Sequence, residues 1–338
     1  MPEPLLKVRD LTTLFKTSTG WFPAIRDVSF DVWPNETLCL VGESGCGKSI
    51  TALSIMGLLP GKKMRRTEGE VVLDGQPLLE LPDKAMRAVR GAKMSMIFQE
   101  PMTSLNPVLP VGLQVAEPLI AHGGLGRAAA EAEALRLLDL VRIPDAARRM
   151  TQYPHQLSGG MRQRVMIAIA LACRPKILFA DEPTTALDVT IQAQVLSLLN
   201  DLRADTGMSL VLITHDLGVV ASMADRVAVM YAGEVVETAS VEALFARPTH
   251  PYTEMLLGSI PRADRDVDTL VAIGGQVPAI DAMPAGCRFA PRCFLAEPGC
   301  RAAAPALTAL RSDERHQIRC RVRIAQAAPE AMRAGAIR

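Results

Sequence analysis

The chain has 338 residues, a length that predicts about two domains, and its 37 basic and 36 acidic residues give a net charge of +1. With 49% hydrophobic residues it can bury a large core, which excludes disorder over most of its length. The balanced charge lacks the basic excess typical of nucleic-acid-binding proteins. The longest apolar run, from Val165 to Cys173, is too short to cross a bilayer, and residues 1–10 lack the apolar core of a secretory signal.

Short apolar runs alternate with helical stretches through roughly the first 245 residues. Buried parallel strands are expected at 39–41, 177–180 and 210–213, and helices at 49–59, 161–173 and 190–204. Two segments, 71–75 and 227–236, predict hairpin strands with turns at Asp74-Gly75 and Ala232-Gly233. The pattern predicts the α/β fold class.

Two regions depart from this alternation. Residues 100–126 are punctuated by Pro and Gly, and a helix rich in Ala, Glu, Leu and Arg follows to about residue 142, so a helical insert is expected. From residue 247 onward Pro, Ala, Arg and Cys are frequent. We expect a linker with extended chain over 249–280, a small cysteine-held unit over 281–322, and a helical or frayed end.

A glycine-rich loop follows the strand expected at 39–41. Residues 42–49 read GESGCGKS and match the phosphate-loop (Walker A) pattern G-x-x-x-x-G-K-[S/T]. Glycines let backbone N–H groups turn inward around phosphate oxygens, and the following helix N-terminus adds a partial positive charge. Lys48 is expected to reach the β- and γ-phosphates, and the Ser49 hydroxyl to ligate Mg²⁺. The predicted nucleotide-binding residues here are Gly42, Ser44, Gly45, Cys46, Gly47, Lys48, Ser49 and Ile50.

The strand expected at 177–180 ends in two acidic residues, Asp181 and Glu182. An apolar strand ending in an acid is the Walker B pattern, in which Asp181 would hold Mg²⁺ directly or through water. Glu182 could polarise the attacking water. An Asp-Glu pair after a strand is by itself usually a solvated strand end. Together with the glycine-rich loop, it predicts a nucleoside-triphosphatase.

Residues 157–160, Leu-Ser-Gly-Gly, resemble the LSGGQ signature of ABC-type ATPases, with Met161 where Gln is commonest. The resemblance implies that Ser158, Gly159 and Gly160 complete the ATP site of a second subunit. Ser158 is also an expected helix N-cap, so cap and signature coincide.

Further positions match the same family in order. Gln99 resembles the Q-loop glutamine, which also contacts Mg²⁺; Asp188, in Ala-Leu-Asp at 186–188, resembles the D-loop; and His215 resembles the switch histidine. The adenine-stacking aromatic is expected at Phe15, with Trp21 the alternative. The catalytic residues that the resemblance implies are Glu182, His215, Gln99 and Lys48, and its Mg²⁺ ligands are Ser49, Gln99 and Asp181.

The resemblance covers nearly the whole chain and implies an ABC ATPase domain over 1–248, with a parallel-sheet core, an antiparallel β subdomain and a helical subdomain at about 100–170. One motif set implies one half of a dimer, and the missing membrane span places the transport path in separate subunits. A soluble ABC ATPase acting on DNA or ribosomes predicts two motif sets, a long coiled coil or a basic surface, and none is present. An iron–sulfur protein with a regulatory nucleotide site predicts a degraded Walker B pattern, but the Asp-Glu pair is intact.

The tail gives a narrower resemblance. His-Pro-Tyr-Thr at 250–253, followed by Leu-Leu at 256–257, resembles the C-terminal extension of dipeptide/oligopeptide importer ATPases, as do 47–59 and 102–107. It implies peptide cargo, a heterodimer with a related ATPase, two permease subunits and an external binding protein, at the cytoplasmic face of the membrane. Glutathione, nickel complexes or sugars stay open as cargo. Residues 100–120 would receive the permease's coupling helix, a solvated proline-rich loop being the alternative.

Four cysteines, Cys287, Cys293, Cys300 and Cys320, lie within 34 residues with the spacing C-x5-C-x6-C-x19-C. Four thiols can ligate Zn²⁺ or an iron–sulfur cluster. The C-x2–4-C pairs favoured by structural zinc sites are absent, and the longer loops suit a bulkier cluster. The peptide-importer resemblance implies a [4Fe–4S] cluster on the extension at 249–338. Zinc, and free or disulfide-linked thiols, are the alternatives.

Arginines near these cysteines could offset the negative charge of thiolate ligands or be solvated surface residues. They are Arg288, Arg292, Arg301 and Arg319. The scattered Cys39, Cys46 and Cys173 are expected to be small buried hydrophobes.

Overall fold

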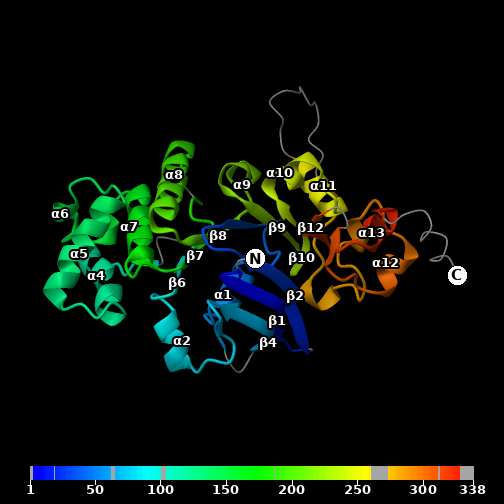
Figure 1. The fold of residues 1–338 in the computed structure, drawn as a ribbon, viewed down its shortest axis with the longest axis horizontal. Coiled ribbons are helices and arrows are strands. Elements are labelled where there is room, and N and C mark those ends of the chain that lie inside the picture. The colour runs from blue at the N-terminus through cyan, green and yellow to red at the C-terminus, as the bar shows by residue number, and fades with distance from the viewer. Residues whose placement is uncertain are drawn as a thin grey trace. The chain divides into compact units, whose positions relative to one another are not determined.

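The structure is a computed structural model that describes residues 3–18, 20–61, 65–99, 104–185, 187–259, 273–310 and 313–327. The chain divides into two compact units. Figure 1 labels the helices and strands that belong to them. Unit 1 comprises Met1–Leu5, Val32–Thr37 and Glu80–Ile213, and unit 2 comprises Leu6–Asp31, Leu38–Leu79 and Thr214–Arg338. The chain passes between the units several times, so each unit joins segments that are far apart in sequence.

A four-stranded antiparallel sheet lies in unit 2. Its strands are β1 (Leu6–Lys16), β2 (Trp21–Val32), β4 (Arg65–Leu73) and β5 (Gln76–Pro77), in the order β2-β1-β4-β5. Leu6 pairs with Leu73, and both side chains are buried. The predicted Asp74-Gly75 turn is confirmed: both residues have positive φ, as a tight hairpin turn requires.

The second group of strands in unit 2 begins with β3 (Thr37–Val41), whose five residues are all buried. It continues with β9 (Arg226–Tyr231), β10 (Glu234–Ser240), β12 (Asp313–Ile318) and β11 (Thr308–Leu310), in the order β3-β9-β10-β12-β11. Only β3 and β9 are parallel among these pairs. The predicted hairpin over 227–236 is confirmed as β9 and β10. Its Gly233 is required, because a Cβ there would lie 2.1 Å from the Ala24 carbonyl oxygen.

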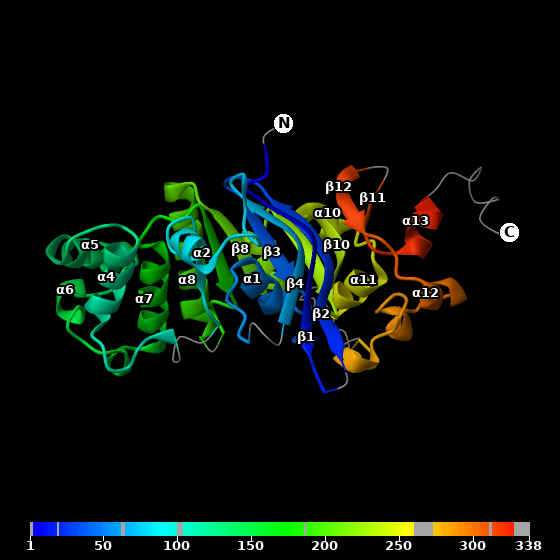
Figure 2. The same ribbon diagram turned by 90° about the horizontal axis from the view of Figure 1, so that it is seen from below.

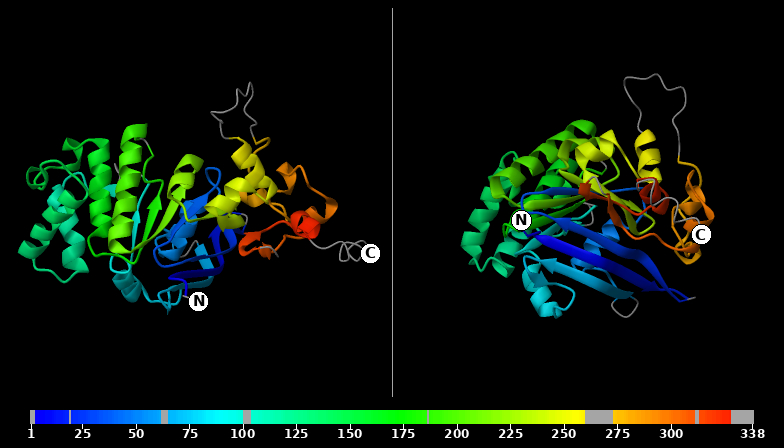
Figure 3. Two further views of the ribbon diagram at one scale, coloured as in Figure 1. Left: turned by 45° about the horizontal axis from the view of Figure 1, so that its top comes forward. Right: turned by 45° about the vertical axis from the view of Figure 1, so that its right-hand side comes forward.

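Unit 1 is built on three parallel strands, β6 (Met94–Ile97), β7 (Ile177–Asp181) and β8 (Ser209–Thr214), in the order β8-β7-β6. Its helices are α2 (Asp83–Val89), α4 (Val111–Ala121), α5 (Arg127–Leu140), α6 (Ala146–Arg149), α7 (Gly159–Leu171) and α8 (Val189–Thr206), with a 3₁₀ turn η2 (Pro154–Gln156). Helices α4, α5 and α7 pack together as the green group in Figure 3. The expected helical insert is therefore present.

The other helices in the part of the chain that the structure describes belong to unit 2. They are α1 (Lys48–Ile55), α9 (Leu217–Met223), α10 (Val241–Ala246), α11 (Pro251–Gly258), α12 (Pro298–Ala302) and α13 (Arg321–Ala327), with 3₁₀ turns η3 (Ile280–Ala282) and η4 (Ala290–Arg292). None of the described helices has the length and apolar character that a membrane span requires.

Three boundaries differ from the prediction. Helix α1 ends at Ile55 rather than 59, because Gly57 turns the chain in the left-handed region before Pro60 is reached. Helix α4 lies within the Pro- and Gly-punctuated stretch at 100–126, ahead of the one helix expected to run to about residue 142, and it tolerates Pro118 in its interior. Helix α11 begins where a linker was expected; Pro251 occupies its first position and His250 caps it, an arrangement that favours helix initiation.

Residues 281–322, expected to form a small cysteine-held unit, do not form a compact unit of their own but belong to unit 2. Strand β12 adds to the edge of β10, with Glu237 opposite Ile318, so the tail extends the sheet of unit 2 (Figure 2). Buried arginines fasten it: Arg319 donates from Nε to the Val235 carbonyl at 2.9 Å, and Arg288 donates to the Ala232 carbonyl. So short a segment buries too little apolar surface to fold alone, which explains its use of the existing sheet.

Candidate functional site

The glycine-rich loop, residues 42–49, connects the end of β3 to the start of α1. Two of its glycines are required by the fold. A Cβ at Gly42 would lie 2.2 Å from the Met230 carbonyl oxygen, and one at Gly47 would lie 2.9 Å from Ile25 Cγ2. Both glycines also have positive φ. Residues Ser44 and Gly45, at the crest of the loop, are exposed.

Lys48 folds back over this loop. Its ammonium Nζ donates to the carbonyl oxygens of Gly42 at 2.8 Å and Glu43 at 3.1 Å, and the residue is 5% exposed. A cation held by neutral carbonyls at a helix N-terminus can bind an anion. Cys46 is buried below it, and burial raises the pKa of its thiol. Ser49 and Ile50 are half-buried.

In unit 1, two of the predicted catalytic residues are in contact. Gln99 Nε2 donates to Glu182 Oε2 at 3.0 Å. Thr185 Oγ1 donates to the same carboxylate oxygen at 2.9 Å, a contact that sequence reasoning missed. Glu182 has a φ of +45°, and its N–H donates to the Ile213 carbonyl. Asp181, which precedes it, is 4% exposed. A non-glycine residue in this strained conformation is typical of functional sites.

The signature residues lie at the start of α7. Ser158 Oγ accepts the Met161 N–H at 3.3 Å, so the predicted N-cap is confirmed. The two glycines differ in their surroundings. A Cβ at Gly160 would lie 2.8 Å from Ile191 Cγ2 on α8, whereas one at Gly159 would meet only Leu187 Cδ2, at 3.8 Å.

Asp188 caps α8 by accepting the Ile191 N–H at 2.9 Å. The neighbouring Ala186 lies outside the described residues. His215 follows β8 and is exposed. Phe15 and Trp21 are both half-buried, and the Arg66 guanidinium lies 4.5 Å from the Trp21 ring centroid.

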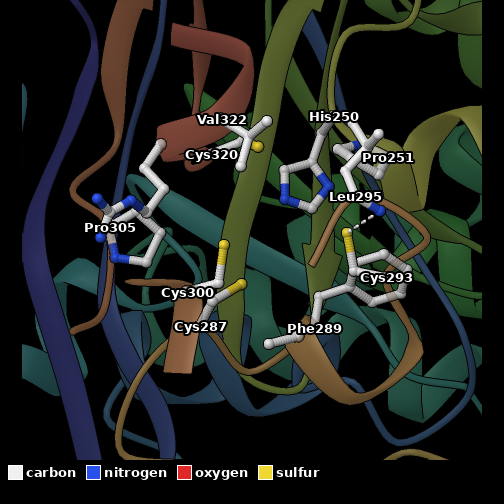
Figure 4. Close-up of a pocket in the computed structure, with 12 residues that line it drawn as sticks. His250, Pro251, Cys287, Phe289, Cys293, Leu295, Cys300, Pro305, Cys320 and Val322 are labelled. Carbon is white, nitrogen blue, oxygen red and sulfur yellow. Dashed lines mark hydrogen bonds between the residues drawn. The ribbon is translucent and has the colours of Figure 1, made fainter. Parts of the chain in front are cut away.

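All four predicted cluster cysteines line one pocket in unit 2, together with His250, Phe289 and Leu295 (Figure 4). The cavity among them measures about 20 Å³, enough for one water molecule. Among the described residues, no group of three or more His, Cys, Asp or Glu side chains is placed to hold a metal ion. Burial raises the pKa of Cys287 to about 11 and also raises the pKa values of Cys293 and Cys320.

His250, on the pocket wall, is fully buried, and burial lowers its pKa to about 4. The ring is therefore neutral at pH 7, and its Nδ1 accepts the Tyr252 N–H at 3.1 Å. The His250 N–H in turn donates to the buried Glu237 carboxylate at 2.8 Å. This network fixes the start of α11.

The tail also contacts the glycine-rich loop. Arg292 makes a two-pronged ion pair with Glu43, at 2.7 and 3.0 Å, and Tyr252 Oη accepts the Glu43 N–H at 3.0 Å. The Glu43 hydrogen bond raises the pKa of Arg292. Sequence reasoning missed these contacts. It offered Arg288, Arg292 and Arg319 as charges beside the cysteines, whereas in the structure they bind Glu43 or backbone carbonyls.

The chain belongs to the ABC transporter family of ATP-binding proteins, which are ATPases that use ATP and Mg²⁺. Residues 25–185 match the family described as "ABC transporter". Within that family, residues 236–300 match "Oligopeptide/dipeptide transporter, C-terminal region". The expected ABC ATPase fold and ATPase activity are thereby confirmed.

Curated relatives are similar over most of their length. The chain is 52% identical to the dipeptide transport ATP-binding protein DppD of Bacillus subtilis, over 94% of each chain. It is 53% identical to a putative peptide import ATP-binding protein of Brucella abortus, over 88% of this chain and 89% of that one.

Solved structures show the same fold. The ATP-binding cassette MJ0796, described as dimeric in a post-hydrolysis state with ADP and Pi, superposes with a TM-score of 0.62 at 31% identity, covering 70% of this chain and 98% of that one. The cbiO1 chain of Clostridium perfringens, part of the transporter complex cbiONQ, gives a TM-score of 0.61 at 25% identity, covering 72% and 92%.

Proposed function

We propose that this chain is the ATP-hydrolysing subunit of an importer for dipeptides or oligopeptides. The match of residues 236–300 to the oligopeptide/dipeptide transporter C-terminal region carries the proposal, and the names of the relatives support it. Cargo such as glutathione, a nickel complex or a sugar is the alternative, because an ATPase subunit does not itself bind the cargo. We place the ATPase domain at 1–248, with its helical subdomain at about 100–170, and the importer-type extension at 249–338.

The glycine-rich loop would bind the β- and γ-phosphates through its backbone N–H groups and the Lys48 ammonium. Ser49, Asp181 and Gln99 would hold Mg²⁺, which when bound offsets the phosphate charge. Glu182 would accept a proton from the attacking water. Its hydrogen bonds from Gln99 and Thr185 support this role, because they orient the carboxylate. His215 would contact the γ-phosphate, and Phe15 would stack on adenine.

A second, related ATPase chain would complete the site. The signature of one chain would contact the ATP bound to the other chain through Ser158, Gly159 and Gly160. Asp188 of the same chain would lie at this shared site as well. The open space at Gly159 supports this arrangement, since the fold of the described chain does not itself require a glycine there. Val189, beside Asp188, is 83% exposed, so its apolar side chain is accessible to a second chain.

Permease subunits would contact a groove on α4. A cavity of about 270 Å³ is lined by Leu109, Leu113, Glu117, Ile120 and Ala121. Leu113 and Ile120 are exposed and apolar, as a surface that receives a coupling helix requires. Of the expected segment 100–120, residues 100–103 lie outside the described part. Two permeases and an external peptide-binding protein would complete the importer, with this chain peripheral at the cytoplasmic membrane face.

The cysteine pocket would hold a [4Fe–4S] cluster, with Zn²⁺ the alternative. The chemistry of the lining supports this proposal, because four thiols line one pocket whose other lining residues include no carboxylate. Because the cavity is small, the four side chains must turn outward to admit a cluster. Ligation also requires the thiols to lose their protons, and burial opposes this at Cys287, Cys293 and Cys320, whose pKa values it raises.

Transport in cells tests the proposed function. Cells lacking the gene would be supplied with the wild-type chain or Lys48→Ala, and uptake of labelled dipeptide, pentapeptide, glutathione, nickel and a disaccharide would be measured. We expect only the wild-type chain to restore peptide uptake. Restoration of a different cargo alone would reject peptides, and full restoration by Lys48→Ala would reject the ATP-driven role. Uptake of a free amino acid through another carrier serves as the control.

A further inference from the structure

Glu43 is an acidic residue inside a loop that would bind anions. It is the second residue of the glycine-rich loop, and its carbonyl oxygen accepts hydrogen bonds from Lys48 Nζ and from the Cys46 N–H. A free carboxylate there would repel phosphate, because like charges at short range disfavour each other. The fold therefore has to neutralise and orient Glu43.

Arg292 supplies the compensating charge. Its two terminal nitrogens each donate to one carboxylate oxygen of Glu43, and the Arg292 side chain is only 4% exposed. The guanidinium is held in turn by the Gly274 carbonyl at 2.9 Å and by the Tyr231 ring, whose centroid lies 5.6 Å away. Such a bidentate ion pair fixes the orientation of the Glu43 carboxylate and also compensates its charge.

Tyr252 holds the backbone of the same residue. Its hydroxyl accepts the Glu43 N–H, and its ring packs against Tyr231 and Phe289 with centroids 4.9 and 5.4 Å apart. All three polar groups of Glu43 are thus hydrogen-bonded. The tail binds the carboxylate and the N–H, and Lys48 binds the carbonyl oxygen.

We propose that Arg292 and Tyr252 are positioning residues of the nucleotide site, which cancel the charge of Glu43 and fix it so that Lys48 and the loop are set for phosphate. This inference rests on the phosphate-binding role proposed above for residues 42–49. The C-terminal extension thereby becomes part of the ATP site, although its residues lie 209 and 249 positions from Glu43.

A double-mutant cycle tests the inference on the full-length chain. The dissociation constant of Mg·ADP would be measured by calorimetry at low and at 0.5 M salt for Arg292→Gln, Glu43→Gln and the double variant. Arg292→Gln should weaken binding about tenfold at low salt and less at high salt, because an uncompensated carboxylate then faces the phosphates. Glu43→Gln alone should change the dissociation constant about twofold or less. The double variant should recover most of the affinity that Arg292→Gln loses.

Two further variants separate positioning from general stability. Tyr252→Phe keeps the aromatic packing and should weaken binding about threefold by removing the acceptor of the Glu43 N–H. Arg323→Gln is the matched control, because it removes an ion pair of the tail that does not involve the loop. Arg323 pairs with Glu254, and the two side chains are each 29% exposed. It should bind Mg·ADP as the wild type does.

Several outcomes would overturn the proposal: unchanged affinity in Arg292→Gln, a double variant as weak as Arg292→Gln, or an equal loss in Arg323→Gln. If Arg292→Gln does not fold, Arg292→Lys carries the test, with an intermediate loss expected and wild-type affinity contradicting it. Loss of binding in Lys48→Ala checks the phosphate-binding role separately, so failure of that role and failure of the inference are distinguishable.

Discussion

Gln99 and Glu182 lie on separate segments, 83 residues apart, yet the Gln99 amide donates to the Glu182 carboxylate at 3.0 Å. The glutamate follows β7 with its backbone in the left-handed region, and Thr185 donates to the same oxygen. Two neutral donors, the Gln99 amide and the Thr185 hydroxyl, therefore fix the direction of the carboxylate.

Replacing Glu182 by Gln should reduce ATP hydrolysis by at least about 100-fold while leaving ATP binding intact, because the amide cannot accept the proton from water. The variant should accumulate as an ATP-bound dimer with its partner ATPase. Phosphate release and gel filtration with ATP provide the two measurements. Hydrolysis at the wild-type rate would show that another group is the base.

Thr185→Val offers a milder change at the same carboxylate. It removes one donor but keeps the shape of the side chain, so we expect kcat to fall about three- to tenfold with little change in KM. A rise in KM together with a fall in melting temperature would instead indicate that the hydroxyl has a structural role.

The two signature glycines provide a matched pair. Gly160→Ala places a methyl group 2.8 Å from Ile191 Cγ2, so it should destabilise the packing of α7 on α8 by about 1–3 kcal/mol. Gly159→Ala has room for its methyl group and should leave the melting temperature unchanged. Its ATPase rate with the partner chain should nevertheless fall strongly, since the methyl would face the second subunit's nucleotide. Normal activity in Gly159→Ala would contradict a close approach at this position.

Leu113→Asp tests the groove on α4. A charge on this apolar surface should abolish ATP-driven peptide uptake by the whole transporter. The basal ATPase rate of the ATPase chains, measured without the permease, should stay near wild type. Leu140→Asp is the control, because Leu140 is equally exposed, at 37% against 38%, and is not among the residues lining the groove. If both variants lose uptake to the same extent, the groove has no special role.

The occupant of the cysteine pocket can be identified by chemical analysis of anaerobically purified chain. A [4Fe–4S] cluster predicts about four irons and four acid-labile sulfides per chain and a visible absorption band. Cys293→Ser should remove both, whereas Cys173→Ser, outside the pocket, should not. One zinc per chain without sulfide would reject the cluster but leave the ATPase assignment intact.

Much of the fold could be predicted because buried parallel strands appear as short apolar runs, as at β3 and β7. The motif residues were equally visible, since phosphate chemistry demands particular residue types at fixed spacing. The tail was misjudged for a physical reason. Arg288 and Arg319 bond to backbone carbonyls, and such partners leave no pattern in a sequence. The pairing of Arg292 with Glu43 was hidden in the same way.

Attachment of β12 to β10 has a consequence for biosynthesis. The chain emerges from the ribosome N-terminus first, so β10 and the glycine-rich loop are made long before the strand and the arginine that join them. Until then β10 presents an open edge, and open edges invite association with other chains. A prematurely terminated product would thus lack both the strand that covers the edge of β10 and the partners of Glu43, and it would be prone to associate with other chains.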